Sequence, residues 1–197
     1  MSSTIAPPVL FGSRRAARRD AERMASRCGL AVGLTVADVG GGNGDFALAL
    51  ARQVYPTGRV FVTEAPGLRF SRLCRRLARL APEIAPVPSG DRQCGLPEGE
   101  CDVVFLRGVY HHLTRAAAFN ANLHAALRPG GRLVIEDFPP RRLLSLFGRP
   151  RGVPEDRGGH GIRAELAARE LAAAGFELRE NIPRWRRDRY LLLFHRP

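Results

Sequence analysis

The stretch Leu34-Thr35-Val36-Ala37-Asp38-Val39-Gly40-Gly41-Gly42-Asn43-Gly44 decides the fold. Its first part, residues 34–39, is a run of apolar and β-branched side chains that is typical of a buried strand. A cluster of glycines follows, and residues 45–54 then predict a helix. Glycines between a strand and a helix let the backbone turn sharply and approach a ligand, which the free amides of the helix can bind. We therefore predict a binding site at Asp38, Gly40, Gly41, Gly42 and Gly44.

The spacing of these glycines indicates the kind of ligand. The dinucleotide-binding pattern has glycines at its first, third and sixth positions. Counted from Gly40, the third position is Gly42 but the sixth is Asp45, so that pattern is not met. The pattern that remains, acid-x-Gly-x-Gly-x-Gly, suits a smaller nucleoside ligand without a pyrophosphate. A glycine-rich turn with no ligand is the alternative, but the flanking strand and helix favour the ligand site.

Two acidic residues follow the next two predicted strands. Glu64 ends the strand predicted at 59–64, and Asp91 comes shortly after a weaker, proline-flanked strand at 84–87. Parallel sheets bind ligands at the carboxyl ends of their strands, where Glu64 is placed to accept both hydroxyls of a ribose. Asp91 is placed to accept from an adenine amino group. The alternatives are a solvated strand-end glutamate and an ordinary turn aspartate.

The rest of the chain alternates predicted strands with predicted helices, which favours a parallel sheet. Pro129-Gly130-Gly131 is expected to end a helix that precedes the fifth strand. No helix separates the last two strands, so they are expected to pair antiparallel. Further strands are predicted at 102–106, 132–137, 176–180 and 190–194, and further helices at 13–28, 68–80, 114–127 and 162–174.

The domain organisation follows from these elements. We predict a flexible tail at 1–12 and a single domain at 13–197, which begins with an Arg-rich helix and contains a long, lid-like Pro/Gly/Arg loop at 141–159. No window approaches the ~18 consecutive apolar residues of a membrane span. The four cysteines form no CxxC pair, so neither a metal site nor a disulfide framework is predicted. These features indicate a cytoplasmic protein, while its oligomeric state stays open.

Together these motifs resemble the class I S-adenosylmethionine-dependent methyltransferases, over about residues 31–196. The resemblance implies an α/β, Rossmann-like fold with helices on both faces of a mostly parallel seven-stranded sheet. It also implies the strand order 3-2-1-4-5-7-6, an antiparallel last strand and S-adenosyl-L-methionine as cofactor. The segments 109–113, 174–176 and 189–194 look like one bacterial group of predicted methyltransferases, akin to the quinone-biosynthesis C-methyltransferases. The motifs are residues 36–44, Glu64, Gly90-Asp91, Asp102-Val103-Val104, 109–113, 127–133, 174–176 and 189–194.

Tyr110, His111 and His112 are the candidate catalytic residues, because they follow the fourth strand at the mouth of the expected crevice. Histidine suits proton removal at neutral pH, and a base is needed only if the acceptor must lose a proton. One histidine capping the next helix while the other packs beneath it is the alternative. Weaker candidates near the same edge are Glu136, Asp137 and His160.

The chain has 31 basic and 19 acidic residues, a net charge of +12, and every basic residue is arginine. Nucleic-acid binding and a coding bias toward arginine both fit this composition. Two arginine clusters bear on the choice, and we interpret both as solvated: a helix face at Arg69, Arg72, Arg75, Arg76 and Arg79, and a hairpin at Arg184, Arg186, Arg187 and Arg189 around Trp185.

The preferred hypothesis is therefore a methyltransferase that acts on a small-molecule acceptor. An RNA methyltransferase that holds phosphates on its arginine surface is the alternative, although the motifs of base amino and cytosine C5 methylation are missing. A non-catalytic protein that kept the fold is a third hypothesis. The intact glycine cluster and Glu64 argue against it.

Overall fold

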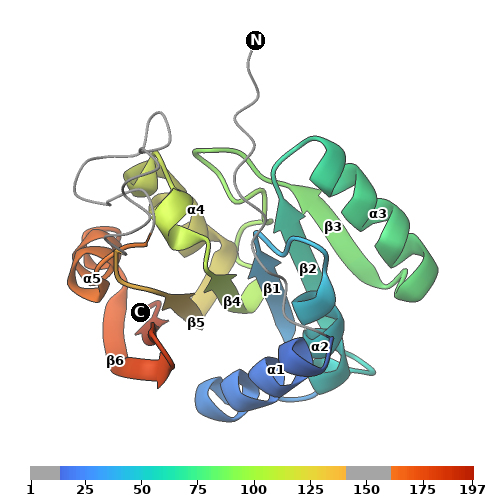
Figure 1. Ribbon diagram of the computed structural model, residues 1–197, viewed down its shortest axis with the longest axis horizontal. Helices are drawn as coiled ribbons and strands as arrows, with labels where there is room; N and C mark the ends of the chain where they lie inside the picture. The colour runs from blue at the N-terminus through green and yellow to red at the C-terminus, as the bar shows by residue number, and fades with distance from the viewer. Residues whose placement is uncertain (1–13, 141–160) are drawn as a thin grey trace.

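The computed structural model describes residues 14–140 and 161–197 (Figure 1). In these ranges the chain forms a seven-stranded sheet in the order β3-β2-β1-β4-β5-β7-β6, as predicted. Strands β1 to β5 pair parallel, and β7 pairs antiparallel with both β5 and β6. The strands are β1 (Thr35–Val39), β2 (Arg59–Glu64), β3 (Ile84–Pro88), β4 (Cys101–Arg107), β5 (Leu127–Asp137), β6 (Glu177–Arg186) and β7 (Arg189–His195).

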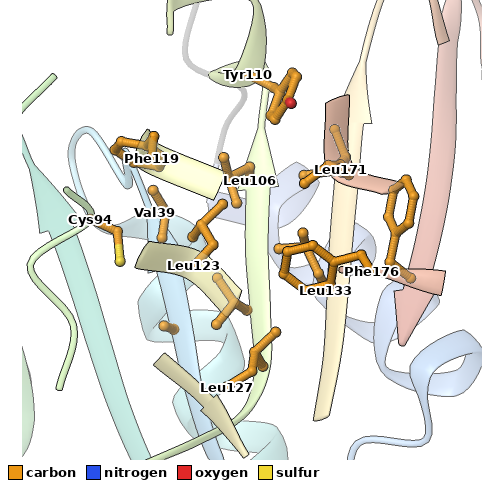
Figure 2. Close-up of a cluster of buried hydrophobic side chains, with 14 of the residues drawn as sticks. Val39, Cys94, Leu106, Tyr110, Phe119, Leu123, Leu127, Leu133, Leu171 and Phe176 are labelled. Atoms are coloured by element: carbon orange, nitrogen blue, oxygen red, sulfur yellow. The ribbon is translucent and has the colours of Figure 1, made fainter. Parts of the chain in front are cut away.

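Helices cover both faces of this sheet, and each face has its own apolar core. Side chains of β4 alternate between the two cores: Val103 and Phe105 pack toward α1–α3, while Val104 and Leu106 pack toward α4 and α5. Figure 2 shows the second core. The helices are α1 (Arg14–Cys28), α2 (Asp45–Val54), α3 (Leu68–Leu80), the short 3₁₀ helix η1 (Tyr110–His112), α4 (Ala116–Ala126) and α5 (Ala164–Ala172).

The fifth strand begins earlier than the sequence-based expectation, whereas the weaker strand predicted at 84–87 is present as β3. The segment Pro129-Gly130-Gly131 was expected to lie between a helix and the fifth strand, but it lies inside β5. The reason is pairing across the sheet: the Gly130 N–H donates to the Arg196 carbonyl at 2.8 Å, and the Arg196 N–H donates to the Gly131 carbonyl at 2.8 Å. The proline-containing β3 forms because it is an edge strand that pairs only with β2, so missing N–H groups are tolerated.

One arginine of the predicted solvated face of α3 is not solvated. Arg76 forms an ion pair with Asp45 at 2.5 Å and donates to the carbonyl of Asn43, and its side chain is only 19% exposed. It therefore ties α3 to the start of α2. The predicted tail at 1–12 and the predicted lid-like loop at 141–159 lie outside the described residues. Among the helices that the structure describes, none is long and apolar enough to cross a membrane.

We expect Phe105→Ala to lower the free energy of unfolding by about 3–5 kcal/mol, because it leaves a cavity beneath α2. Phe105 is fully buried, and its ring meets the Phe46 ring edge-on at a centroid distance of 5.5 Å. Urea denaturation measures the change. Leu68→Ala, at a side chain that is 76% exposed, is the matched control and should change the stability by less than about 0.5 kcal/mol. Equal effects of the two substitutions would contradict the described packing.

Candidate functional site

The glycine loop, residues 40–44, connects the end of β1 to the start of α2 at the carboxyl edge of the sheet (Figure 1). Gly40, Gly42 and Gly44 have φ values of 70°, 58° and 81°, a backbone conformation that other residues rarely adopt. The N–H of Gly41 donates to the carbonyl of Thr63 at 2.9 Å, which attaches the loop to β2. The predicted turn is thus present, and its backbone requires glycine.

Gly41 is the point of closest approach in this loop. A Cβ atom at Gly41 would lie 2.7 Å from Asp38 Oδ2 and would also collide with Val62. The loop backbone therefore lies directly against the end of β1 and the middle of β2. This packing occupies the inner side of the loop.

Glu64 lies beside the loop, as the sequence predicts. Its Oε2 accepts the N–H of Gly42 at 3.0 Å, and its Oε1 accepts the N–H of Ala65 at 3.1 Å. The side chain is buried, so these two bonds fix the carboxylate at the carboxyl end of β2. Each carboxylate oxygen keeps a second lone pair, which leaves Glu64 able to accept from a ligand hydroxyl.

Asp38 is the most electrostatically perturbed carboxyl of the described residues. Its burial raises its pKa to about 7, an effect that the positive charge of Arg107 opposes and the negative charge of Glu64 reinforces. Its Oδ2 is buried, and within residues 14–140 and 161–197 it has no hydrogen-bond partner. A buried acceptor left unpaired is costly, and it favours a ligand that brings a donor or a positive charge.

Asp91, the third predicted cofactor residue, is placed differently. It follows β3 at the same edge, where the Ser89 N–H donates to the Glu64 carbonyl at 3.0 Å. Its side chain is 65% exposed, and its Oδ2 lies 3.6 Å from Nε of Arg115. The structure therefore leaves Asp91 open to solvent near Glu64, and its contact with an adenine stays a prediction.

His111 and Asp137 form a buried pair on the α4–α5 face of the sheet. His111 Nδ1 lies 2.9 Å from Asp137 Oδ1, and the His111 backbone N–H donates to Asp137 Oδ2 at 3.1 Å. The Phe138 N–H also donates to Asp137, at 2.9 Å. Because an ionised carboxylate only accepts, Nδ1 of a neutral His111 carries the proton and Nε2 presents its lone pair.

The other two catalytic candidates of η1 lie in different surroundings. Tyr110 is fully buried and lies at one end of the core drawn in Figure 2. Its hydroxyl donates to Glu170 at 2.9 Å and accepts from Asn120 at 2.7 Å, which anchors η1 to α4 and α5. His112 is exposed, with its ring 4.0 Å from that of His111. Of the three, His111 has the geometry of a base, whereas His160 lies outside the described residues.

On the opposite face lies a group that sequence reasoning missed, which we call the arginine–carboxylate cluster: Arg107, Arg186, Arg189, Asp20 and Glu136. Arg107 donates to Glu136 at 3.0 Å and to Asp20 at 2.7 Å, and its guanidinium carbon lies 4.0 Å from the Phe46 ring centroid. Arg186 also pairs with Asp20. The predicted solvated hairpin is thus wrong for Arg186. The polar residues Arg107 and Glu136 near the ends of β4 and β5 were the signal that the sequence offered. That signal did not reveal their partner Asp20 on α1.

No group of three His, Cys, Asp or Glu side chains among residues 14–140 and 161–197 is arranged to hold a metal ion.

Comparison with known proteins places these observations in context. The methyltransferase domain family matches residues 12–181. The ubiquinone/menaquinone biosynthesis C-methyltransferase of Cupriavidus taiwanensis is 29% identical over 116 residues, 57% of this chain and 46% of that protein. The demethylspheroidene O-methyltransferase of Rhodobacter capsulatus is 31% identical over 103 residues, 52% of this chain and 25% of that protein. The chain thus spans less than half the length of these two curated relatives.

Solved structures agree on the fold. A crystal structure described as a SAM-dependent methyltransferase from Aquifex aeolicus superposes with a TM-score of 0.76 and covers 95% of both chains, at 20% sequence identity. The predicted strand order and the predicted family resemblance are both confirmed.

We expect Asp38→Asn to make the ligand-free protein more stable above pH 7, by up to about 4 kcal/mol. The carboxyl has an ordinary pKa of 3.8 and a pKa of about 7 in the folded protein, so the unfolded chain loses its proton first as pH rises. The wild-type free energy of unfolding should therefore decrease from about pH 4 to about pH 7 and then level off.

The amide that replaces the carboxyl in Asp38→Asn cannot ionise, so this decrease should be absent from the variant, and the two proteins should converge toward pH 4. Denaturant unfolding at a series of pH values measures the difference. Asp91→Asn, at an exposed position, is the control and should keep the wild-type profile. Parallel profiles for wild type and Asp38→Asn would contradict the buried, unpaired state of this carboxyl.

Proposed function

The chain belongs to the methyltransferase domain family, and from this premise we propose that it transfers a methyl group from S-adenosylmethionine to a small-molecule acceptor. The observation that carries the proposal is the glycine loop, whose backbone is hydrogen-bonded to the Glu64 carboxylate and to Thr63 at the carboxyl edge of β2. That arrangement brings a backbone cradle and a carboxylate to one place, as a nucleoside ligand requires.

The residues present fit this cofactor. Glu64 would accept from the ribose hydroxyls, and Asp91 would accept from the adenine amino group. The glycine loop, Gly40 to Gly44, would lie against the nucleoside. Asp38, with its unpaired buried oxygen beside Gly41, gives the site a negative charge that complements the positive charges of the cofactor's ammonium and sulfonium groups.

The bound cofactor supplies an activated methyl group on a positively charged sulfur. The protein then has to bind both reactants and align them, and such positioning contributes up to about 7–11 kcal/mol to lowering a barrier. Where the acceptor must lose a proton, His111 Nε2 is the group that would take it. Asp137 orients the imidazole and stabilises the positive charge that results.

The acceptor class follows from the relatives rather than from the arginine content. Both named relatives methylate small molecules according to their names, which supports a small-molecule acceptor over RNA. Arg76 and Arg186 do not support the RNA alternative, because both pair with carboxylates of the chain itself.

The four cysteines are all free thiols, which supports a reducing, cytoplasmic environment.

We expect Glu64→Gln to weaken binding of S-adenosylhomocysteine, the cofactor product, by about 1–3 kcal/mol. The amide loses the charge-assisted bonds to the ribose, and its NH₂ group cannot accept the N–H of Gly42 or Ala65. Titration calorimetry of wild type and variant measures the change.

Glu98→Gln, at an exposed glutamate before β4, is the matched control and should bind like wild type. If the product does not bind the wild-type protein, the proposed function fails. If it binds wild type and Glu64→Gln with equal affinity, the assignment of Glu64 to the ribose fails while the function stands.

We expect the neutral imidazole of His111 to carry its proton on Nδ1, since that nitrogen faces Asp137 at 2.9 Å. Nitrogen NMR of histidine-labelled protein at a pH where the ring is neutral reads the tautomer directly. Asp137→Asn should give a mixture of tautomers, because an amide can both donate and accept. A proton found on Nε2 of the wild type would exclude His111 as the base, because that nitrogen would then have no free lone pair.

A further inference from the structure

The arginine–carboxylate cluster holds more positive than negative charge. Three guanidinium groups share two carboxylates, those of Asp20 and Glu136, which are 8% and 1% exposed. Arg107 is fully engaged: it donates to both carboxylates and stacks on Phe46. With the buried carboxylates already bonded to Arg107, the cluster has a surplus positive charge at the carboxyl edge of the sheet.

Arg189 is the arginine of this cluster whose positive charge is not paired at hydrogen-bond distance. Its Nε lies 3.8 Å from Glu136 Oε1, beyond hydrogen-bond distance, and its guanidinium carbon lies 5.4 Å from the Phe138 ring centroid. Across the described ranges, 14–140 and 161–197, no hydrogen bond engages its guanidinium. Its side chain is only 25% exposed, and its donors form no hydrogen bond with the part of the chain that the structure describes.

Glu136 lies on the other side of this contact and does not use the donors of Arg189. Its Oε1 is buried and has no hydrogen-bond partner among the described residues, although Nε of Arg186 and Nε of Arg189 lie 3.9 Å and 3.8 Å away. A buried carboxylate oxygen facing two guanidinium groups that do not reach it is unusual, since such groups normally close to bonding distance. Nε of Arg186 and Nε of Arg189 are thus not bonded to Glu136.

The position of Arg189 connects this surplus to the reaction. A Cβ atom at Gly108, just after β4, would lie 3.4 Å from Nη1 of Arg189, so the guanidinium lies over the end of that strand. The Phe138 ring contacts Arg189, and its centroid also lies 4.8 Å from that of His111. Phe138 is therefore a common neighbour of Arg189 and of His111.

We propose that Arg189 binds a carboxylate of the methyl acceptor, so that the acceptor is an anionic small molecule. The inference rests on the proposed function and deepens it. Arg189 is suited to this role because its planar guanidinium can donate two parallel bonds to one carboxylate. Glu136 and Phe138 position the group, and Arg186 adds positive charge beside it.

The test uses benzoate and its neutral counterpart benzamide as probes of the protein saturated with S-adenosylhomocysteine. Trp185 is the only tryptophan of the chain and lies in the same hairpin, so its fluorescence reports binding there. We expect wild type to bind benzoate at least about tenfold more tightly than benzamide, the preference that a charge-assisted bond provides. In Arg189→Gln this preference should disappear, and Arg189→Lys should restore part of it.

Arg179→Gln is the matched control, because Arg179 lies on β6 of the same hairpin and forms only an exposed ion pair with Glu177. It should keep the wild-type preference, and circular dichroism melts verify that each variant folds. Wild type that binds benzoate no more tightly than benzamide, or equal loss of preference in the Arg179 and Arg189 variants, would overturn the proposal.

The cofactor also has a carboxylate, and a second comparison separates the two sources. S-adenosylhomocysteine carries that group, whereas 5′-methylthioadenosine lacks it. If Arg189→Gln weakens the binding of S-adenosylhomocysteine but not that of 5′-methylthioadenosine, Arg189 binds the cofactor carboxylate and the acceptor assignment is wrong. We expect the variant to bind each of these two nucleosides with nearly the wild-type affinity. Failure of wild type to bind either nucleoside would instead refute the proposed function itself.

Discussion

In the register of the central strands, Val39 of β1 lies opposite Thr63 of β2 and Leu106 of β4, so all three strands end at one edge of the sheet. Parallel pairing imposes this alignment, and the polar residues that end the strands have to meet there. The glycine loop keeps its amides bonded at that edge, to the Thr63 carbonyl and to Glu64. The proposed nucleoside site is therefore a consequence of strand register, since any slip would separate Asp38 from Glu64.

A second constraint, the alternation of side chains along β5, divides the same edge into two chemical environments. Glu136 points to the α1 face, where Arg107 binds it, and Asp137 points to the opposite face, where it binds His111. One face therefore concentrates charge and the other holds a proton acceptor. Phe138, the next residue, neighbours a group of each environment: its ring centroid lies 5.4 Å from the Arg189 guanidinium carbon and 4.8 Å from the His111 ring centroid.

The sequence predicts local features of this architecture and misses contacts that tertiary packing creates. The glycine loop and Glu64 could be predicted because strand, turn and helix signals are contiguous in the chain. Arg107 and Asp20 are 87 residues apart, and their contact depends on how α1 docks on the sheet. Periodicity placed Arg76 on a solvated face for the same reason: it shows which side of α3 is apolar but not that α2 lies within reach of a long side chain.

The arginine content also has an explanation that composition could not reveal. Arg132 donates to the carbonyls of Cys28 and Gly29 at the end of α1, and Arg196 donates to those of Ala125 and Leu127 around the end of α4. Helix C-termini carry unpaired carbonyls and a partial negative charge, and Nη1 of each of these arginines donates to two carbonyls there. The donors of these two arginines are thus used inside the fold rather than offered to a polyanion at the surface.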